Sequence, residues 1–217
     1  MLIDISSTMP MQIQDISVHD STLPLMYIGT LAGVPTINNS ITVSDIIVFD
    51  CLIPNDIDMI LVDNLQSEYE FSIVFDNLTF SNIHFELGGN LIKYSHLLTN
   101  SFQLSNSSFS NITGGRINLE SYTADIDEFS TKVLMNNIHA DNINSEYGSF
   151  IVLKTGADLT IVDSEFTNMN SYEQGSVISA GTELTTTIIQ NTVFENNTAI
   201  RGGVIYAEQR SSVECLN

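Results

Sequence analysis

Two pairs of aspartates with the same spacing stand near the N-terminus and are the first candidates for chemistry. The pairs are Asp15 with Asp20 and Asp45 with Asp50. Two carboxylates that face one groove about 5 to 9.5 Å apart can hydrolyse a glycosidic bond. The same two positions hold asparagine in most later copies of the pattern, and an amide cannot serve as a general acid or base. These pairs are therefore predicted to be structural.

The aspartates belong to a phrase that the chain repeats: Asn or Asp, two residues, an apolar residue, one residue, and Asn or Asp again. Seven copies begin 30, 32, 29, 31, 26 and 28 residues apart, a period that indicates stacked structural repeats. We expect the polar residues to form ladders at sharp corners, because Asn and Asp tolerate a left-handed backbone and amides can bond between repeats. The ladder residues are Asp15, Asp45, Asn77, Asn106, Asn137, Asp163 and Asn191 in the first slot and Asp20, Asp50, Asn82, Asn111, Asn142, Asn168 and Asn196 in the second.

Apolar residues flank each phrase and must form the elements that position it. An apolar residue precedes every copy by two positions, in order Ile13, Val43, Phe75, Leu104, Met135, Ile161 and Ile189. A second short run follows each later phrase and begins with glycine, as in Val204 to Tyr206 after Gly202 and Gly203. Short, glycine-led runs rich in β-branched and aromatic residues favour strands. Inside the coil, the phrase predicts an aromatic column of Phe80, Phe109, Phe166 and Phe194 that Ala140 interrupts.

Composition limits the functions that this chain can have. The chain has 217 residues, 43% of them hydrophobic, which is enough to bury a core as one domain. Six Lys and Arg residues face 26 Asp and Glu residues, and a formal charge of -20 disfavours nucleic acid binding. No apolar stretch is long enough for a membrane span, and the first residues show no signal peptide.

The repeat predicts one parallel β-helix domain over residues 1–217, less regular in 1–72 and more regular in 73–217. An eighth copy begins with Cys215 in the apolar slot and Asn217 in the first ladder slot. We therefore expect the chain to be a fragment of a longer array that is cut at the start of an eighth coil. Uncovered strands at such a cut are expected to self-associate or to fray.

Two cysteines and five sequons can be placed by the same register. Cys51 and Cys215 both occupy apolar slots, so we expect two buried thiols, several coils apart, with no disulfide between them. Four sequons fall on the ladder residues Asn77, Asn106, Asn111 and Asn196. If those side chains belong to an internal stack, only the sequon at Asn38 can accept a glycan in a secreted protein.

The last copy contains the phrase Asn191-Thr-Val-Phe-Glu-Asn-Asn followed by Gly202-Gly-Val-Ile-Tyr206. This sequence resembles the repeat of the polymorphic outer-membrane protein family and of related surface proteins of protists, and weaker copies cover the whole chain. The resemblance implies a right-handed parallel β-helix of the pectin-lyase-like class. It also implies a secreted or cell-surface, often adhesive, passenger with an anchor that is not found in these residues.

Enzymes that act on polysaccharides share that fold, so they form the rival class. Polygalacturonase-like enzymes need clustered aspartates on adjacent coils, a Gly-His-Gly segment and an Arg-Ile-Lys segment, and the only near match in this sequence is Arg116-Ile117-Asn118. Calcium is a further alternative, since Asp56, Asp58 and the run Asp125 to Glu128 are acidic clusters and stacked Asp15 and Asp45 repel each other. Neither cluster matches a known calcium loop.

The sequence thus predicts an all-β, right-handed parallel β-helix of about seven coils. The expected function is a non-catalytic structural or adhesive segment of an extracellular or cell-surface protein, without cofactor, metal or catalytic residues. The expected partners are surface glycans or proteins. The alternative is a secreted lyase or glycoside hydrolase, which two acidic residues and a basic residue converging in one cleft would favour.

Overall fold

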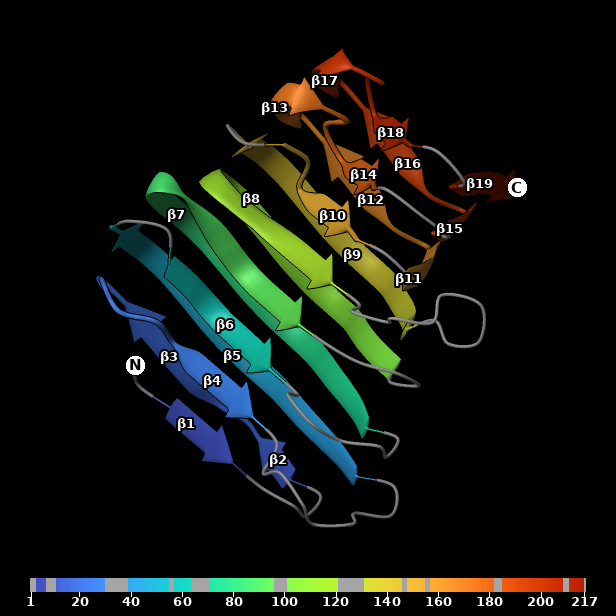
Figure 1. Ribbon diagram of the computed structural model, residues 1–217. Helices are drawn as coiled ribbons and strands as arrows, with labels where there is room; N and C mark the ends of the chain where they lie inside the picture. The colour runs from blue at the N-terminus through green and yellow to red at the C-terminus, as the bar shows by residue number, and fades with distance from the viewer. Residues whose placement is uncertain are drawn as a thin grey trace.

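The chain folds into a parallel β-solenoid, which confirms the predicted fold class (Figure 1). The solenoid has about six turns, whereas about seven coils were expected. The computed structural model describes residues 3–6, 11–29, 39–54, 57–63, 71–95, 101–120, 131–145, 148–154, 157–181, 185–208 and 211–216. These residues form 19 strands of one sheet, and every strand pair between successive turns is parallel. Within these ranges there is no helix, and hence none that could span a membrane.

The strands are β1 (Ile3–Ser6), β2 (Met11–Ile13), β3 (Ile16–His19), β4 (Met26–Gly29), β5 (Asn39–Ile53), β6 (Ile57–Asp63), β7 (Phe71–Ser95), β8 (Ser101–Glu120), β9 (Thr131–Ser145), β10 (Ile151–Leu153), β11 (Ala157–Val162), β12 (Glu165–Thr167), β13 (Asn170–Gln174), β14 (Ile178–Ala180), β15 (Thr186–Gln190), β16 (Val193–Glu195), β17 (Thr198–Arg201), β18 (Ile205–Ala207) and β19 (Ser212–Leu216).

Each full turn has four walls, which we number in chain order. The first wall precedes the first ladder residue, and the second wall lies between the two ladder residues. The third wall follows the second ladder residue, and the fourth contains the glycine-led apolar run. The clearest example is the last full turn, whose walls are β15, β16, β17 and β18, each paired with its counterpart in the preceding turn.

The first strands of the chain lie at one end of the stack and the last strands at the other (Figure 1). The long strands β5, β7, β8 and β9 run through more than one wall, because their ladder residues bend the chain without ending its pairing. The stacking therefore places equivalent residues of successive copies directly beside each other.

The core consists of columns of apolar side chains, one residue per turn. The column that the sequence predicted before the first corner is confirmed: Val43 pairs with Phe75, Phe75 with Leu104, and Leu104 with Met135. All four side chains are fully buried. A second column on the fourth wall consists of Met26, Ile60, Ile92, Ile117, Ile151, Ile178 and Ile205. Full burial of each such aliphatic side chain contributes roughly 1.5 to 3 kcal/mol.

The aromatic column between the corners is present in two segments. The rings of Phe80 and Phe109 stack with centroids 5.6 Å apart and planes inclined by 6°, and Phe166 stacks on Phe194 at 5.5 Å and 13°. Ala140 pairs between Phe109 and Phe166 and offers no ring. Phe150, buried and close to the fourth wall, instead contacts Phe109 edge-on at 5.4 Å.

The two cysteines differ, and one expectation is wrong. Cys51 is buried at 3% exposure and its Sγ donates to the carbonyl oxygen of Phe49, as a core thiol should. Cys215 pairs with Ile189 in the expected register but is exposed. β19 is packed only against β15, so nothing within the described ranges covers the thiol from the other side. Both cysteines are free thiols.

Candidate functional site

The fourteen ladder residues all lie at corners with a left-handed backbone. Their φ angles range from 48° at Asn191 to 61° at Asp15, and no other non-glycine residue in the described ranges has a positive φ. A left-handed conformation strains most L-residues, whereas Asn and Asp adopt it readily. The repeated phrase thus marks two corners per turn, which we call the first and second corners.

At the second corner, the side-chain amides form a continuous chain of hydrogen bonds. Asn142 donates to Asn111 at 2.8 Å, Asn111 donates to Asn82 at 3.0 Å, and Asn82 donates to Oδ1 of Asp50 at 2.9 Å. Every donor lies one turn later than its acceptor. Asp50 ends the chain because its side chain has no amide group that could donate to the preceding turn.

At the first corner the asparagines also donate to the preceding turn, but the chain of hydrogen bonds is interrupted more often. Asn137 donates to Asn106 at 2.9 Å, Asn191 donates to Asp163 at 3.1 Å, and Asn77 donates to Asp45 at 2.7 Å. In two hydrogen bonds the acceptor is the residue that precedes a ladder residue. Asn106 donates to Asp76 at the first corner, and Asn168 donates to Asp141 at the second corner. Asparagine extends a ladder and aspartate ends it.

Both ladders stand on the outside of the solenoid, so the expectation of an internal stack at the sequons is wrong. All fourteen ladder residues are exposed. Apolar side chains fill the interior of the corner, so the left-handed turn directs the Asn and Asp side chains to solvent. The sequons at Asn77, Asn106, Asn111 and Asn196 are therefore not shielded by burial, which removes the reason for choosing Asn38 alone. Asn38 itself lies outside the described residues.

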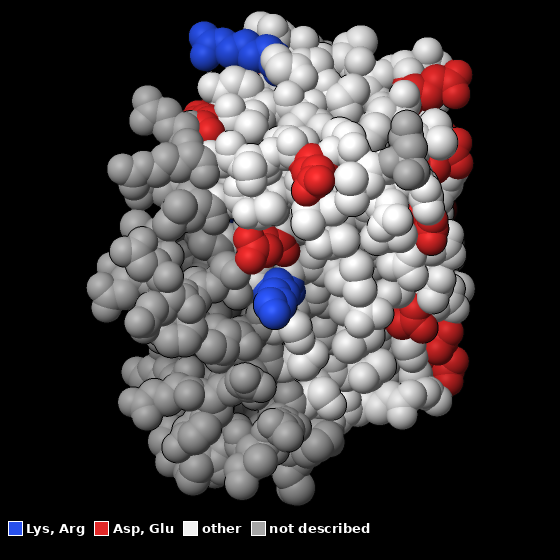
Figure 2. All heavy atoms as spheres, turned by 90° about the vertical axis from the view of Figure 1, so that its right-hand side faces the viewer, with Lys and Arg blue, Asp and Glu red and all other residues white. Residues whose placement is uncertain are grey.

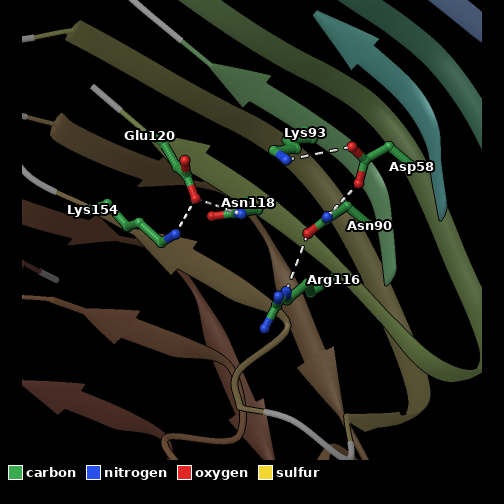
Figure 3. Close-up of polar contacts among 7 residues, drawn as sticks. All are labelled: Asp58, Asn90, Lys93, Arg116, Asn118, Glu120 and Lys154. Carbon is green, nitrogen blue, oxygen red and sulfur yellow. Dashed lines mark hydrogen bonds and ion pairs between the residues drawn. The ribbon is translucent and has the colours of Figure 1, made fainter. Parts of the chain in front are cut away.

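A polar cluster on the fourth wall brings together charged residues that are far apart in the sequence (Figure 3). In its first half, Lys93 Nζ lies 3.5 Å from Oδ2 of Asp58, and Asn90 donates to Oδ1 of the same carboxylate. Arg116 Nε then donates to Asn90 Oδ1 at 3.1 Å. Pairing in register places Asp58 beside Asn90 and Asn90 beside Arg116 on β6, β7 and β8.

The second half of the cluster is centred on a buried carboxylate. The Glu120 side chain is 8% exposed, and Lys154, which follows β10, donates to its Oε1. Asn118 donates to the same oxygen at 3.0 Å. Asn118 is 3% exposed, and its own Oδ1 is buried with no hydrogen-bond partner. A buried acceptor of this kind ordinarily requires a donor, such as water or a ligand hydroxyl.

The cluster holds three of the six Lys and Arg residues of the chain, and each carboxylate is bonded to a lysine and an amide. Its seven members are Asp58, Asn90, Lys93, Arg116, Asn118, Glu120 and Lys154. They come from four different repeats, so no local motif reveals them. The sequence marks Asp58 as acidic and Arg116-Ile117-Asn118 as a near match to an enzyme segment, but it does not connect them. The register of the structure does, since it pairs Asn90 with Arg116 and Lys93 with Asn118.

A shallow groove of about 510 Å³ crosses the first wall of β8, β9, β11 and β15. Outward side chains of one column, Gln103, Leu134, Thr160 and Ile188, line its floor. Lys132 and Asp158, which are partners in register, lie beside them. The groove is therefore a mixed surface of amide, hydroxyl, aliphatic and charged groups that runs across the turns.

Most of the acidic residues that were weighed as an alternative calcium site cannot be placed. Asp56 and the run Asp125 to Glu128 lie outside the described residues. Among the residues that are described, no group of three or more His, Cys, Asp and Glu side chains could hold a metal ion. The face in Figure 2 shows acidic side chains along one edge and few basic ones, in keeping with the charge of -20.

The early aspartates take part in the ladders, since Asp45 and Asp50 accept hydrogen bonds from Asn77 and Asn82. The geometry shows corner ladders, one paired polar cluster and one lateral groove. A comparison with protein-family models finds no family that matches this chain, and neither the curated proteins nor the solved structures include a match.

Proposed function

We propose that this chain is a non-catalytic structural and adhesive segment of an extracellular or cell-surface protein. The observation that carries the proposal is the use of the corner side chains: the amides at both corners bond from turn to turn. Amides that bond to each other between successive turns hold a rod together, and an amide is neither a general acid nor a general base. The resemblance to the repeats of polymorphic outer-membrane proteins supports the same role and a right-handed winding.

The adhesive surface in this proposal is the groove on the first wall, and its ligand is a neutral glycan. Amide and hydroxyl groups such as those of Gln103 and Thr160 match sugar hydroxyls, and the aliphatic side chains between them match the apolar faces of sugar rings. A chain with a formal charge of -20 repels polyanions, which disfavours acidic polysaccharides.

Binding to immobilised neutral and acidic polysaccharides tests this function. The Gln103→Ala and Thr160→Ala variants are expected to lose binding to the neutral ligand. Gln12→Ala is the matched control, because Gln12 is an exposed glutamine on the first wall of the first turn, outside the groove residues. Equal loss in all three variants, or binding to no polysaccharide, would contradict the proposal.

A second candidate is a secreted lyase or glycoside hydrolase, and the polar cluster is the observation that favours it. Two carboxylates and three basic residues lie on one wall, with Arg116 and Asn118 at the positions that resemble the Arg-Ile-Lys segment. The test is release of reducing ends or of unsaturated uronates from polysaccharides. Product release that Glu120→Gln abolishes and Glu165→Gln leaves intact would favour the enzyme.

A further inference from the structure

The floor of the groove on the first wall alternates between polar and apolar side chains from turn to turn. The outward column to which it belongs runs in register through Val74, Gln103, Leu134, Thr160, Ile188 and Glu214. Its four middle members line the groove. Each of the four groove strands, β8, β9, β11 and β15, is paired at both edges, so the groove lies within the stack and not at an end of it (Figure 1).

The stacking of the turns sets the spacing of this alternation. Paired parallel strands lie about 4.8 Å apart, so side chains of the same kind recur about every 9.6 Å along the groove, and its four strands span about 14 Å. In an extended glycan with β-1,4 linkages, each sugar ring is turned by about half a revolution relative to the ring before it. The disaccharide repeat of such a chain is close to twice the strand spacing, so every second ring meets the same kind of side chain.

The two polar positions of the floor can bond sugar hydroxyls. Gln103 Nε2 donates to Oγ of Ser105 at 2.9 Å, and Ser105 is buried. This bond orients the side-chain amide, whose Oε1 accepts no hydrogen bond from a described residue. Thr160 offers a hydroxyl, which both donates and accepts. The aliphatic side chains of Leu134 and Ile188 follow these polar groups on the next turns, where the apolar face of a sugar ring can pack.

One edge of the groove supplies a polar side chain on every turn. This second column consists of Ser101, Lys132, Asp158 and Thr186. Lys132 and Asp158 are partners in register and carry opposite charges, so the formal charge of this edge is zero. The edge therefore suits a chain of neutral sugars that presents hydroxyls along its length.

We propose that the groove binds an extended neutral glycan with β-1,4 linkages, which lies across the turns with one sugar ring on each. Gln103 and Thr160 hydrogen-bond every second ring, and Leu134 and Ile188 pack against the rings between them. Glycans with α-1,4 or β-1,3 linkages curve into helices, so they do not keep every second ring in the same orientation along this line. The inference rests on the proposed function, because it specifies the ligand of the same groove.

The test is isothermal titration calorimetry of the full chain with neutral hexasaccharides. Cellohexaose and mannohexaose have β-1,4 linkages, laminarihexaose has β-1,3 linkages and maltohexaose has α-1,4 linkages. The first two are expected to bind about tenfold more tightly than the others, since a mismatched repeat loses one or two hydrogen bonds. Equal or tighter binding of laminarihexaose or maltohexaose would overturn this inference and leave the proposed function standing, whereas binding of no hexasaccharide would overturn both.

Two double variants test the alternation itself. Gln103→Leu with Leu134→Gln exchanges two neighbouring side chains, so it keeps the composition of the groove, breaks the alternation and is expected to lose the preference for β-1,4 linkages. Gln103→Thr with Thr160→Gln exchanges the two polar side chains, keeps the alternation and is expected to retain that preference. The exchanged side chains face the groove and not the core, so both variants keep the buried columns. The same linkage preference in the two double variants would overturn the proposal.

Discussion

Asn111 donates a hydrogen bond from Nδ2 to Oδ1 of Asn82, 3.0 Å away on the preceding turn. It also accepts one from Asn142 and holds φ at 53°. One exposed residue therefore makes three contributions to the corner: a donor, an acceptor and a left-handed backbone.

Substitutions at Asn111 can separate these contributions. Asn111→Asp keeps the acceptor and loses the donor, so we expect a loss of about 1 kcal/mol in the free energy of unfolding. Asn111→Gly loses both hydrogen bonds but keeps the backbone. Asn111→Leu also strains the left-handed turn, which adds about 1 to 2 kcal/mol. Urea denaturation measures the order Asp, Gly, Leu, and equal losses in the three variants would show that the ladder contributes no stability.

Two glycines with similar positive φ provide a test of packing at the bends. A Cβ on Gly175 would overlap the carbonyl oxygen of Ile178 and lie 2.9 Å from the amide nitrogen of Tyr206, whereas a Cβ on Gly203 would meet nothing within 4 Å. Gly203→Ala should therefore cost only the backbone strain, about 1 to 2 kcal/mol. Gly175→Ala should cost clearly more in thermal or urea denaturation. A similar cost at both sites would contradict the close approach of the fourth wall to Gly175.

Asp141 should make stability depend on acidic pH. Thr167 Oγ1 and Asn168 Nδ2 each donate to its Oδ1 at 2.7 Å, and these bonds lower the pKa of Asp141 below its ordinary value of 3.8. Because the folded pKa is lower than the unfolded one, the stabilisation is present above the unfolded pKa and disappears as the pH falls through the folded pKa.

Thr167→Val removes the larger cause, so it is expected to raise the pKa of Asp141 and to reduce the loss of stability at acidic pH. Thr167→Ser keeps the hydroxyl and is the control. A ¹³C NMR titration of the Asp141 carboxyl measures the shift, and an unchanged pKa in Thr167→Val would contradict the assignment.

The two thiols should differ sharply in reactivity. Burial raises the pKa of Cys51, which leaves less thiolate to react, while Cys215 is exposed. Iodoacetamide on the folded chain is therefore expected to modify Cys215 first, as peptide mass spectrometry would show, and urea should equalise the two sites. Faster modification of Cys51 in the folded chain would contradict its burial.

Lys154 should stabilise the buried carboxylate of Glu120. Lys154→Met leaves that carboxylate without its ammonium partner, and we expect a loss of about 1 to 3 kcal/mol because Lys154 is half exposed. Lys132→Met, at an exposed lysine on the first wall, is the control. Glu120→Gln in the Lys154→Met background should restore part of the loss, and no restoration would mean that charge is not the cause.

The sequence by itself determined the solenoid, both corners of each turn and the apolar columns. Asn and Asp at a fixed spacing satisfy a local requirement, a left-handed turn, and the apolar residues around Phe80 or Phe109 alternate with the period of a strand. Such local preferences act on neighbouring residues, and a period of 26 to 32 residues repeats them at every turn.

Only the tertiary structure decided the features that depend on contacts between turns. These contacts are the ladder hydrogen bonds, the ion pair of Glu120 with Lys154 and the strand pairing that leaves Cys215 exposed. Each of them joins residues that are 26 or more positions apart in the sequence. Their geometry depends on which turn covers which, because a side chain in an interior slot is buried only if another turn lies beyond it. That is why Cys51, with turns on both sides, is buried, and Cys215, in the same kind of slot, is not.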